Sequence, residues 1–155
     1  MAIAVGTKAP AFALLSKPGG IEDLAKVIGV EKTVLLFFPF AFSSVCTAEM
    51  CHLRDGWTRW QTLGCRVFGI SVDSPFTTEK FREAERIPFP ILSDFNKEVA
   101  RQYGVLLDEL MGFKGVAARA AFVMDAGGTV RYAKINASPR DQVDFPAIEE
   151  ALRSC

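Results

Sequence analysis

The chain has 155 residues, which is enough for one domain and short for two, so we expect a single domain over residues 1–155. Half of the residues are hydrophobic and 23% are charged, a composition that excludes a disordered chain. Lysine and arginine number 18, as do aspartate and glutamate. The formal net charge is therefore zero, and neither nucleic acid nor an anionic membrane is expected as a partner.

The predicted elements alternate between strands and helices. The apolar, β-prone run at 33–38 predicts a strand buried on both faces, and Pro39 ends it. Strand, helix and strand then follow one another over 33–72, which predicts a parallel βαβ unit. The whole pattern predicts an α/β domain with a central mixed β-sheet flanked by helices. We expect strands at 33–38, 65–72, 120–124 and 129–135, an extended segment at 87–90, helices at about 45–63, 75–86, 96–103 and 144–152, and turns at 17–20 and 125–128.

Membrane and export signals are missing from this pattern. No apolar run approaches the roughly 18 residues of a membrane span. The longest run, residues 34–42, is interrupted by Pro39. Residues 1–10 lack a basic region followed by an apolar one, so no secretory signal is recognised. We therefore expect a cytoplasmic location and no membrane partner.

The helix predicted after Pro39 carries an apolar stripe that should face the sheet. Apolar side chains recur along it with spacings of 4, 3, 4 and 3, as in a helix with one buried face. Ser43 and Ser44 precede the stripe as natural N-caps, so its first member lies in the first helical turn. The stripe consists of Cys46, Met50, Leu53, Trp57 and Trp60.

Cys46 is one of four cysteines, and its position has chemical consequences. The N–H groups of the first turn have no intrahelical partner and the positive end of the helix dipole lies there, so both favour a thiolate. The alternative interpretation of Cys46 is a small buried apolar residue. Cys51 is either a helix residue without a role or half of a C-x4-C zinc site, which needs two further ligands. Few candidates remain for them: Cys65, Cys155, the single histidine His52 and the carboxylates.

The segment that contains Cys46 resembles the peroxiredoxin active-site motif, P-x-x-x-[TS]-x-x-C-x-x-E. Pro39, Ser43, Cys46 and Glu49 fill its four fixed positions, directly after a buried strand and at the start of a helix. The resemblance covers almost the whole chain and combines features of the alkyl hydroperoxide reductase E-like branch and the Q-type branch, also called bacterioferritin comigratory protein. Other segments that resemble the family are GTKAPAF at 6–12, GISVDS at 69–74, PILSD at 90–94 and RAAFVMD at 119–125.

The resemblance implies a thioredoxin-like fold and an antioxidant thiol peroxidase that uses neither a cofactor nor a metal. Cys46 would be the peroxidatic cysteine, which attacks a hydroperoxide and becomes a sulfenic acid. Arg119, the Ser43 hydroxyl and the backbone N–H of Cys46 would donate to the peroxide oxygens. Arg119 would also hold Cys46 ionised. Glu49 would orient Arg119, and Pro39 would shield the thiolate from water.

Cys51 is then the candidate resolving cysteine, which would form an intramolecular disulfide with Cys46. The alternatives are a one-cysteine enzyme resolved by an external thiol and a thiol redox sensor. Thioredoxin, glutaredoxin or a low-molecular-weight thiol would serve as the reductant. A thioredoxin-type disulfide oxidoreductase fits less well, because that chemistry requires C-x-x-C. We expect Cys65 to be structural, and Cys155 to be mobile and either a spare resolving thiol or without a role. His52 is expected to be a solvated surface residue.

Two aromatic residues flank Ala41 in the loop beside Cys46. Phe40 and Phe42 should be partly exposed there, and exposed aromatic side chains often mark an interface. We therefore expect a homodimer that forms through Phe40 and Phe42. Their apolar side chains would also suit an apolar hydroperoxide substrate.

Overall fold

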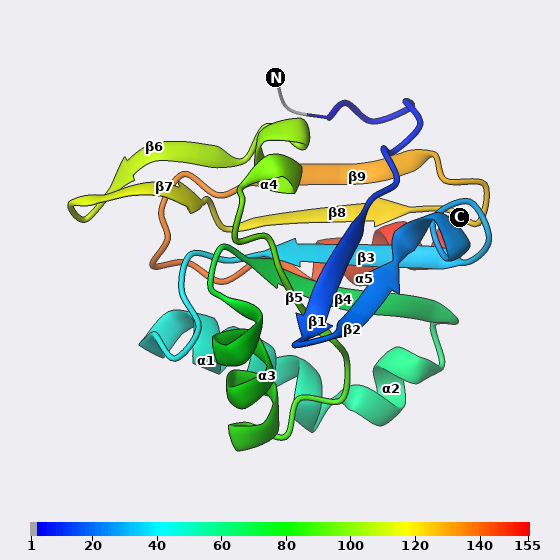
Figure 1. Ribbon diagram of the computed structural model, residues 1–155. Coiled ribbons are helices and arrows are strands. Elements are labelled where there is room, and N and C mark those ends of the chain that lie inside the picture. Colours follow the sequence, from blue (N-terminus) through cyan, green and yellow to red (C-terminus); the bar gives the residue numbers. More distant parts are fainter. Residues whose placement is uncertain (1–2) are drawn as a thin grey trace.

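A seven-stranded mixed sheet forms the centre of the protein in the computed structural model, which describes residues 3–155 (Figure 1). Its strands lie in the order β2-β1-β5-β4-β3-β8-β9, and the β6–β7 hairpin forms a separate two-stranded sheet. The strands are β1 (Ala13–Lys17), β2 (Gly20–Asp23), β3 (Lys32–Phe37), β4 (Cys65–Ser71), β5 (Ile91–Ser93), β6 (Leu106–Leu110), β7 (Phe113–Ala117), β8 (Ala120–Met124) and β9 (Val130–Ile135). The helices are η1 (Leu24–Lys26, a 3-10 turn), α1 (Ser44–Asp55), α2 (Trp57–Gln61), α3 (Pro75–Ala84), α4 (Glu98–Gln102) and α5 (Phe145–Arg153).

Strand β3 lies in the middle of the sheet, parallel to β4 and antiparallel to β8. Leu35 and Phe37 project into the apolar cluster on one face, and Val34 and Leu36 into the cluster on the other. All four side chains are at most 1% exposed. A strand buried on both faces needs an unbroken apolar run, which is what this segment offers. The predicted strand and the predicted parallel βαβ unit are both confirmed.

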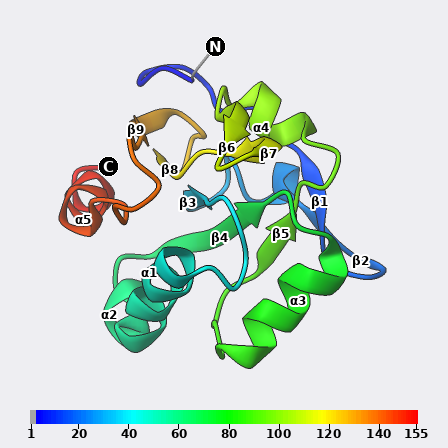
Figure 2. The same cartoon turned by 90° about the vertical axis from the view of Figure 1, so that its left-hand side faces the viewer.

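Helices cover both faces of this sheet. α1, α2, α3 and α5 contribute apolar side chains to the cluster on one face, whereas α4 and η1 contribute to the other (Figure 2). The predicted α/β class, with a central mixed sheet flanked by helices, is confirmed. Among residues 3–155, no helix is both long enough and apolar enough to cross a membrane.

The helix predicted over 45–63 is wrong in its continuity, because it breaks at Gly56 into α1 and α2. Gly56 adopts φ −101° and ψ 16°, which is not helical, and glycine costs about 1 kcal/mol more than alanine inside a helix. The apolar stripe survives the break in part. Its members Cys46, Met50, Leu53 and Trp60 are buried, whereas Trp57 is half-buried and packs on Phe89.

Two hairpins were not predicted as strands. The turn predicted at 17–20 joins β1 to β2, but β2 is a short strand at the sheet edge, β1 is the short strand next to it, and neither carries a long apolar run. The β6–β7 hairpin carries charged residues on its exposed side and turns through Met111 and Gly112, which have φ +53° and +83°. Both residues of such a two-residue turn require positive φ, and the preferred sequences are Asn-Gly and Asp-Gly, so Met-Gly gives a weak signal.

Candidate active site

The loop between β3 and α1 is held from two sides. The backbone N–H of Ala41 donates to Oδ2 of Asp73 at 2.8 Å, so the residues after β4 anchor its middle. Phe42 has φ +69°, an uncommon conformation for a bulky residue that clusters at functional sites. Its ring packs on Phe81 of α3 with 5.2 Å between centroids. The loop therefore delivers the chain into α1 with a defined direction.

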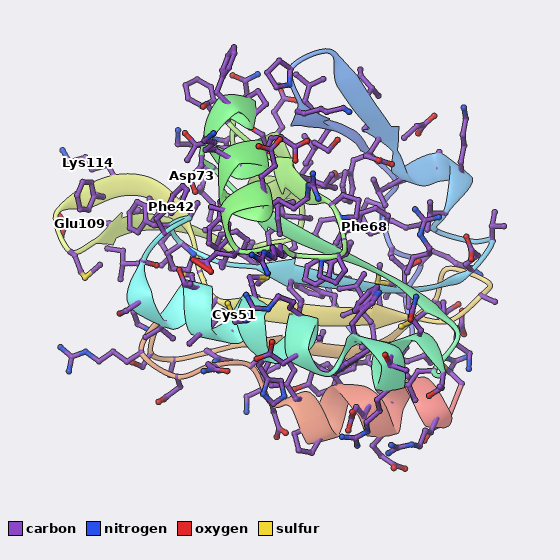
Figure 3. All side chains as sticks on the ribbon, turned by 90° about the horizontal axis from the view of Figure 1, so that it is seen from below. Phe42, Cys51, Phe68, Asp73, Glu109 and Lys114 are labelled. Atoms are coloured by element: carbon purple, nitrogen blue, oxygen red, sulfur yellow. The ribbon has the colours of Figure 1, made fainter. Side chains whose placement is uncertain are left out.

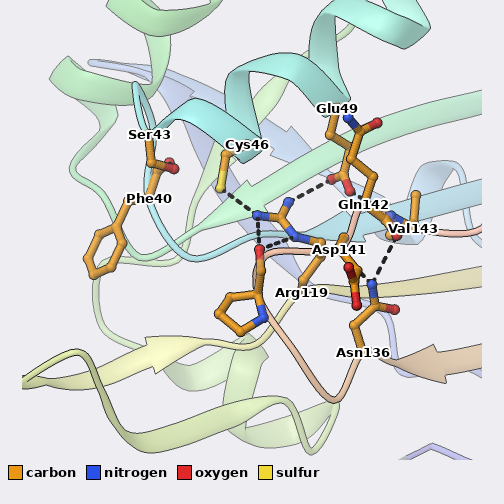
Figure 4. Close-up of polar contacts among 10 residues, drawn as sticks. Phe40, Ser43, Cys46, Glu49, Arg119, Asn136, Asp141, Gln142 and Val143 are labelled. Atoms are coloured by element: carbon orange, nitrogen blue, oxygen red, sulfur yellow. Dashed lines mark hydrogen bonds and ion pairs between the residues drawn. The ribbon is translucent and has the colours of Figure 1, made fainter.

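Cys46 is the third residue of α1, and its side chain is only 1% exposed. This position matches the prediction that it lies in the first helical turn, where N–H groups have no intrahelical partner. Its Sγ accepts a hydrogen bond from Nη2 of Arg119 at 3.1 Å (Figure 4). A cation and the first turn of α1 thus converge on the Cys46 sulfur.

Arg119 immediately precedes β8 and is 2% exposed. Its side-chain nitrogens contact a main-chain oxygen and a carboxylate. Nε and Nη2 donate to the main-chain oxygen of Pro139 at 3.2 and 3.0 Å, and Nη1 lies 3.2 Å from Oε2 of Glu49 (Figure 4). The Nη1–Oε2 contact is an ion pair without hydrogen-bond alignment, since neither atom has a hydrogen-bond partner in the described residues. Because the guanidinium is planar, these contacts fix the direction in which it meets Cys46.

Glu49 lies one turn after Cys46 and is completely buried. Its second oxygen, Oε1, accepts a hydrogen bond from the N–H of Val143 at 2.9 Å. Burial raises the pKa of the Glu49 carboxyl, while the Arg119 charge and the Val143 N–H oppose that rise. Removing one partner of such a buried pair leaves an uncompensated charge, which costs about 3–5 kcal/mol.

Ser43 occupies the N-cap position of α1, but its side chain makes no capping hydrogen bond. Instead, its hydroxyl donates to the main-chain oxygen of Phe40 at 2.8 Å. Ser43 thus holds the predicted N-cap position without capping the helix through its side chain, whereas Ser44 is the first helical residue and not a cap. The Ser43 hydroxyl, expected to donate to the peroxide oxygens, donates to Phe40 instead; its oxygen lines the pocket above Cys46 and keeps lone pairs that can accept a hydrogen bond.

A pocket of about 170 Å³ opens over Cys46. That volume is several times the roughly 30 Å³ that a water molecule occupies in the liquid. Arg119 and Ser43 supply polar groups, and most of the remaining wall is apolar. A larger hollow of about 790 Å³ lies between α1, α2 and α5, but no cysteine lines it. The apolar wall over Cys46 consists of Pro39, Phe40, Val45, Leu110, Met111 and Pro139.

Several residues of this pocket were not predicted from the sequence. Leu110 and Met111 come from the tip of the β6–β7 hairpin, and Pro139 comes from the loop after β9. None of them belongs to a motif, and each reaches the pocket through tertiary packing alone. Asp73, which anchors the loop, lies within the segment at 69–74 but gave no sign of that role in the sequence.

The other three cysteines lie outside the pocket, and all are half-buried. Sγ of Cys51 lies 3.7 Å from Oε2 of Glu85, the residue that follows α3. Burial raises the pKa of the Cys51 thiol, and the charge of Glu85 and its hydrogen bond add to that effect. Cys65 begins β4, and Cys155 donates to the main chain of α5. His52 is exposed, as expected, and stacks on Phe145.

Comparison with known proteins agrees with this geometry. The model of the AhpC/TSA family matches residues 5–133. The chain is 32% identical over 165 residues to the chloroplastic 2-cysteine peroxiredoxin of Chattonella marina, covering 99% of this chain and 80% of that protein. It is 31% identical over 158 residues to mouse peroxiredoxin-2, covering 96% and 76%. The crystal structure of peroxidoxin BcpB from Mycobacterium tuberculosis superposes with a TM-score of 0.84 at 29% identity, covering 97% of this chain and 96% of that one. The chain therefore belongs to the AhpC/TSA family and is a peroxiredoxin, a thiol-dependent peroxidase with a thioredoxin-like fold.

Proposed function

We propose that Cys46 is the peroxidatic cysteine of this peroxidase. Its thiolate attacks the terminal oxygen of a hydroperoxide, so an S–O bond forms and the O–O bond breaks. The sulfur becomes a sulfenic acid, and the remaining alkoxide or hydroxide takes up a proton and leaves as an alcohol or water. The observation that carries this proposal is the 3.1 Å contact between Arg119 and the Cys46 sulfur at the floor of a pocket.

Charge on the peroxide oxygens develops beside preorganised donors. The Arg119 guanidinium, already fixed by Pro139 and Glu49, can donate to the leaving oxygen, together with the unpaired N–H groups of the first turn of α1. The hydroxyl of Ser43 donates to Phe40, so its oxygen is free to accept the hydrogen bond of an incoming hydroperoxide. Buried Pro39 covers the thiolate and limits its hydration.

The assignment of Cys46 can be tested by trapping its sulfenic acid. A chain in which Cys51 is replaced by serine should receive one equivalent of hydrogen peroxide and then a cyclic 1,3-diketone, which couples to sulfenic acids. Peptide mapping should place the adduct on Cys46. An adduct that forms on Cys65 or Cys155 instead, with Cys46 unmodified, contradicts the assignment.

The pocket favours hydroperoxides that carry an apolar substituent. Its walls are mostly apolar, and its volume of about 170 Å³ leaves room beyond that of hydrogen peroxide itself. Leu110 and Met111 would contact such a substituent, because the β6–β7 hairpin brings them over Cys46. We therefore propose that both hydrogen peroxide and organic hydroperoxides are substrates, and that the apolar wall contributes to the binding of the organic ones.

We further propose that Cys51 resolves the sulfenic acid. In an intact helix the two cysteines are about 7.5 Å apart along the axis and about 140° apart around it. A disulfide needs Cα atoms within about 4.4–6.8 Å and Cβ atoms directed at each other, so the first turns of α1 must unwind. Unwinding breaks the contacts of Cys46 and Glu49 with Arg119 and the contact of Cys51 with Glu85. The enzyme would alternate between a folded, peroxide-reactive form and a locally unfolded, reductant-reactive form.

Mass spectrometry after one equivalent of peroxide should therefore detect a Cys46–Cys51 disulfide. Amide hydrogen exchange in that oxidised form should be faster over residues 45–52, because the helix can no longer close. A persistent sulfenic acid, or a link between Cys46 and a second chain, would instead identify a one-cysteine or intermolecular enzyme. Until the helix opens, the sulfenic acid can meet a second peroxide, so slow opening should promote overoxidation to sulfinic acid.

A variant that removes the charge of Glu85 gives a second test of the proposed resolving role of Cys51. Glu85→Gln removes a carboxylate that contacts the Cys51 thiol in the closed helix and adds to the rise that burial causes in its pKa. Disulfide formation at neutral pH should become several-fold faster, measured as the second phase after a peroxide pulse. Glu83→Gln removes an exposed charge from the same helix and should leave this phase unchanged.

The reductant is proposed to be a protein dithiol of the thioredoxin type, which exchanges with the Cys46–Cys51 disulfide exposed by the open helix. Glutaredoxin and low-molecular-weight thiols are the alternatives, and turnover with each as the only reductant separates them. The cytoplasmic location stays a prediction, and it would supply any of these reductants.

We also propose a homodimer that forms through Phe40 and Phe42. Phe42, Met111 and Phe113 are 51%, 72% and 57% exposed, and Phe40 packs on Phe113 with 5.1 Å between ring centroids. Phe40 and Met111 line the pocket, and burial of such apolar side chains against a partner would stabilise the dimer by about 1.5–3 kcal/mol per side chain. Figure 3 places Phe42 beside the β6–β7 hairpin, which carries the labelled Glu109 and Lys114.

Analytical ultracentrifugation at micromolar concentration should detect a dimer of the unmodified chain and a monomer of Phe42→Asp. The introduced carboxylate would have to be desolvated at the interface, which is unfavourable without a partner charge. Ile21→Asp changes a residue that is 67% exposed on the edge strand β2 and should leave the dimer intact. A monomeric unmodified chain would contradict the proposed dimer.

A further inference from the structure

Two cysteines that the peroxidase site does not use are both linked to the amino end of strand β3. Cys65 begins β4 and pairs in register with Lys32, which begins the parallel strand β3. Neighbours in register share a face of the sheet, and Cys65 packs on the apolar cluster to which α5 contributes. Nζ of Lys32 donates to the main-chain oxygen of Leu152 at 3.0 Å, and Sγ of Cys155 lies 3.7 Å from that same oxygen. One carbonyl of α5 thus brings Cys155 to the lysine that lies beside Cys65.

Burial and two neighbouring groups act on the pKa of the Cys65 thiol. Burial raises the pKa of the Cys65 thiol to about 11. The Lys32 ammonium lowers that pKa in part, whereas negative charge on Cys155 raises it. Cys155, expected to be mobile, is half-buried and contacts the main chain of α5.

We propose that Cys65 and Cys155 form a second redox-active pair, which a low-molecular-weight disulfide oxidises to an intramolecular disulfide between the start of β4 and the end of α5. In the first step the Cys155 thiolate attacks one sulfur of the oxidant RSSR, a new S–S bond forms and RS⁻ leaves. In the second step the Cys65 thiolate attacks the Cys155 sulfur and releases the second RS⁻. The two cysteines lose two electrons and two protons, and the oxidant becomes two RSH.

This pair is separate from the peroxidase site. Cys46 follows the carboxyl end of β3, whereas Cys65 and Lys32 lie at the amino ends of β4 and β3. Six residues of strand span about 17–20 Å, so Cys155 lies out of reach of Cys46 within one folded chain. The inference is therefore independent of which residue resolves Cys46.

The chemistry of Cys65 makes this disulfide slow in both directions. A thiol with a pKa of about 11 is almost entirely protonated at neutral pH, so the closing step is slow. The same thiol is a poor leaving group, so reduction by attack on the Cys155 sulfur is slow as well. Such a bond would form under sustained oxidation and persist. It would attach α5 covalently to β4 and would not take part in a catalytic cycle.

The test uses the Cys46→Ser/Cys51→Ser double variant, in which only the proposed pair remains, incubated with oxidised glutathione. Peptide mapping without reduction should identify a link between Cys65 and Cys155, and Tm should rise by at least about 5 °C because the closed loop restricts the unfolded chain. Adding Cys155→Ser to this background should abolish both effects. Separate glutathione adducts on the two cysteines, free thiols with an unchanged Tm, or a Cys155–Cys155 link between chains would each overturn the proposal.

Lys32 provides a second, kinetic readout. Lys32→Met removes the ammonium that lowers the pKa of Cys65 and should slow disulfide formation several-fold. Lys32→Arg should restore the rate, and Lys26→Met, on the other face of the sheet, should not change it. Equal rates in all three variants would contradict the proposed arrangement. Peroxidase turnover of Cys155→Ser with Cys46 and Cys51 intact should be unchanged, so failure of this proposal is distinguishable from failure of the active-site assignment.

Discussion

Replacing Cys46 with serine should reduce peroxide consumption to the uncatalysed rate. A serine hydroxyl is not ionised at neutral pH and cannot be oxidised to the sulfenic acid on which turnover depends. The fold should persist, because serine is nearly the same size as cysteine and the hydrogen bond with Arg119 can be retained. Consumption of hydrogen peroxide and of an organic hydroperoxide, coupled to a dithiol reductant, measures the loss.

The matched control is Cys65→Ser, which changes another half-buried cysteine outside the pocket. Its peroxidase activity should stay close to that of the unmodified chain. Turnover that survives in Cys46→Ser, or that disappears in Cys65→Ser with an intact fold, would place the peroxidatic thiol elsewhere. Circular dichroism of both variants separates loss of chemistry from loss of structure.

Replacing Arg119 with alanine should slow peroxide reduction by about 10²–10³-fold, equivalent to about 2.7–4 kcal/mol for one lost donor to a developing negative charge. Arg119 contacts the attacking sulfur and is directed into the pocket, so its removal affects both the thiolate and the transition state. Stopped-flow measurement of the first oxidation step isolates this effect from later resolution. A rate within threefold of the unmodified chain would exclude a catalytic role.

The alanine variant also leaves Glu49 buried without its cation, which is destabilising and could reduce activity through unfolding. The double variant Arg119→Met/Glu49→Gln removes both charges together and keeps an amide acceptor for the N–H of Val143. It should recover the stability lost in Arg119→Ala but remain slow. Recovery of the oxidation rate along with the stability would mean that Arg119 acts only through the fold.

The strands and helices that could be predicted from the sequence are those whose signals lie in neighbouring residues. The strand at β3 and the β8–β9 hairpin follow from short apolar runs and turn residues, and the helix starts follow from serine, proline and aspartate at their first positions. The break of the long helix was equally local, since Gly56 stands in the sequence, but the periodicity of the stripe on both sides concealed it. The exposed β6–β7 hairpin left no apolar run to detect.

The active site likewise has features that follow from neighbouring residues and features that depend on tertiary contacts. The sequence by itself determined that Cys46 opens a helix after a buried strand, because strand, Pro39 and helix are consecutive. Only the tertiary structure decided that the main-chain oxygen of Pro139 fixes the Arg119 guanidinium, that Leu110 reaches over the thiol, and that the Ser43 hydroxyl binds Phe40 in place of the helix N-terminus. It alone links Cys155 to Lys32, the register partner of Cys65, through the main-chain oxygen of Leu152. The physical reason is that backbone propensities and periodicity act between near neighbours in the chain, whereas these contacts join segments dozens of residues apart and depend on how the helices and loops pack around the completed sheet.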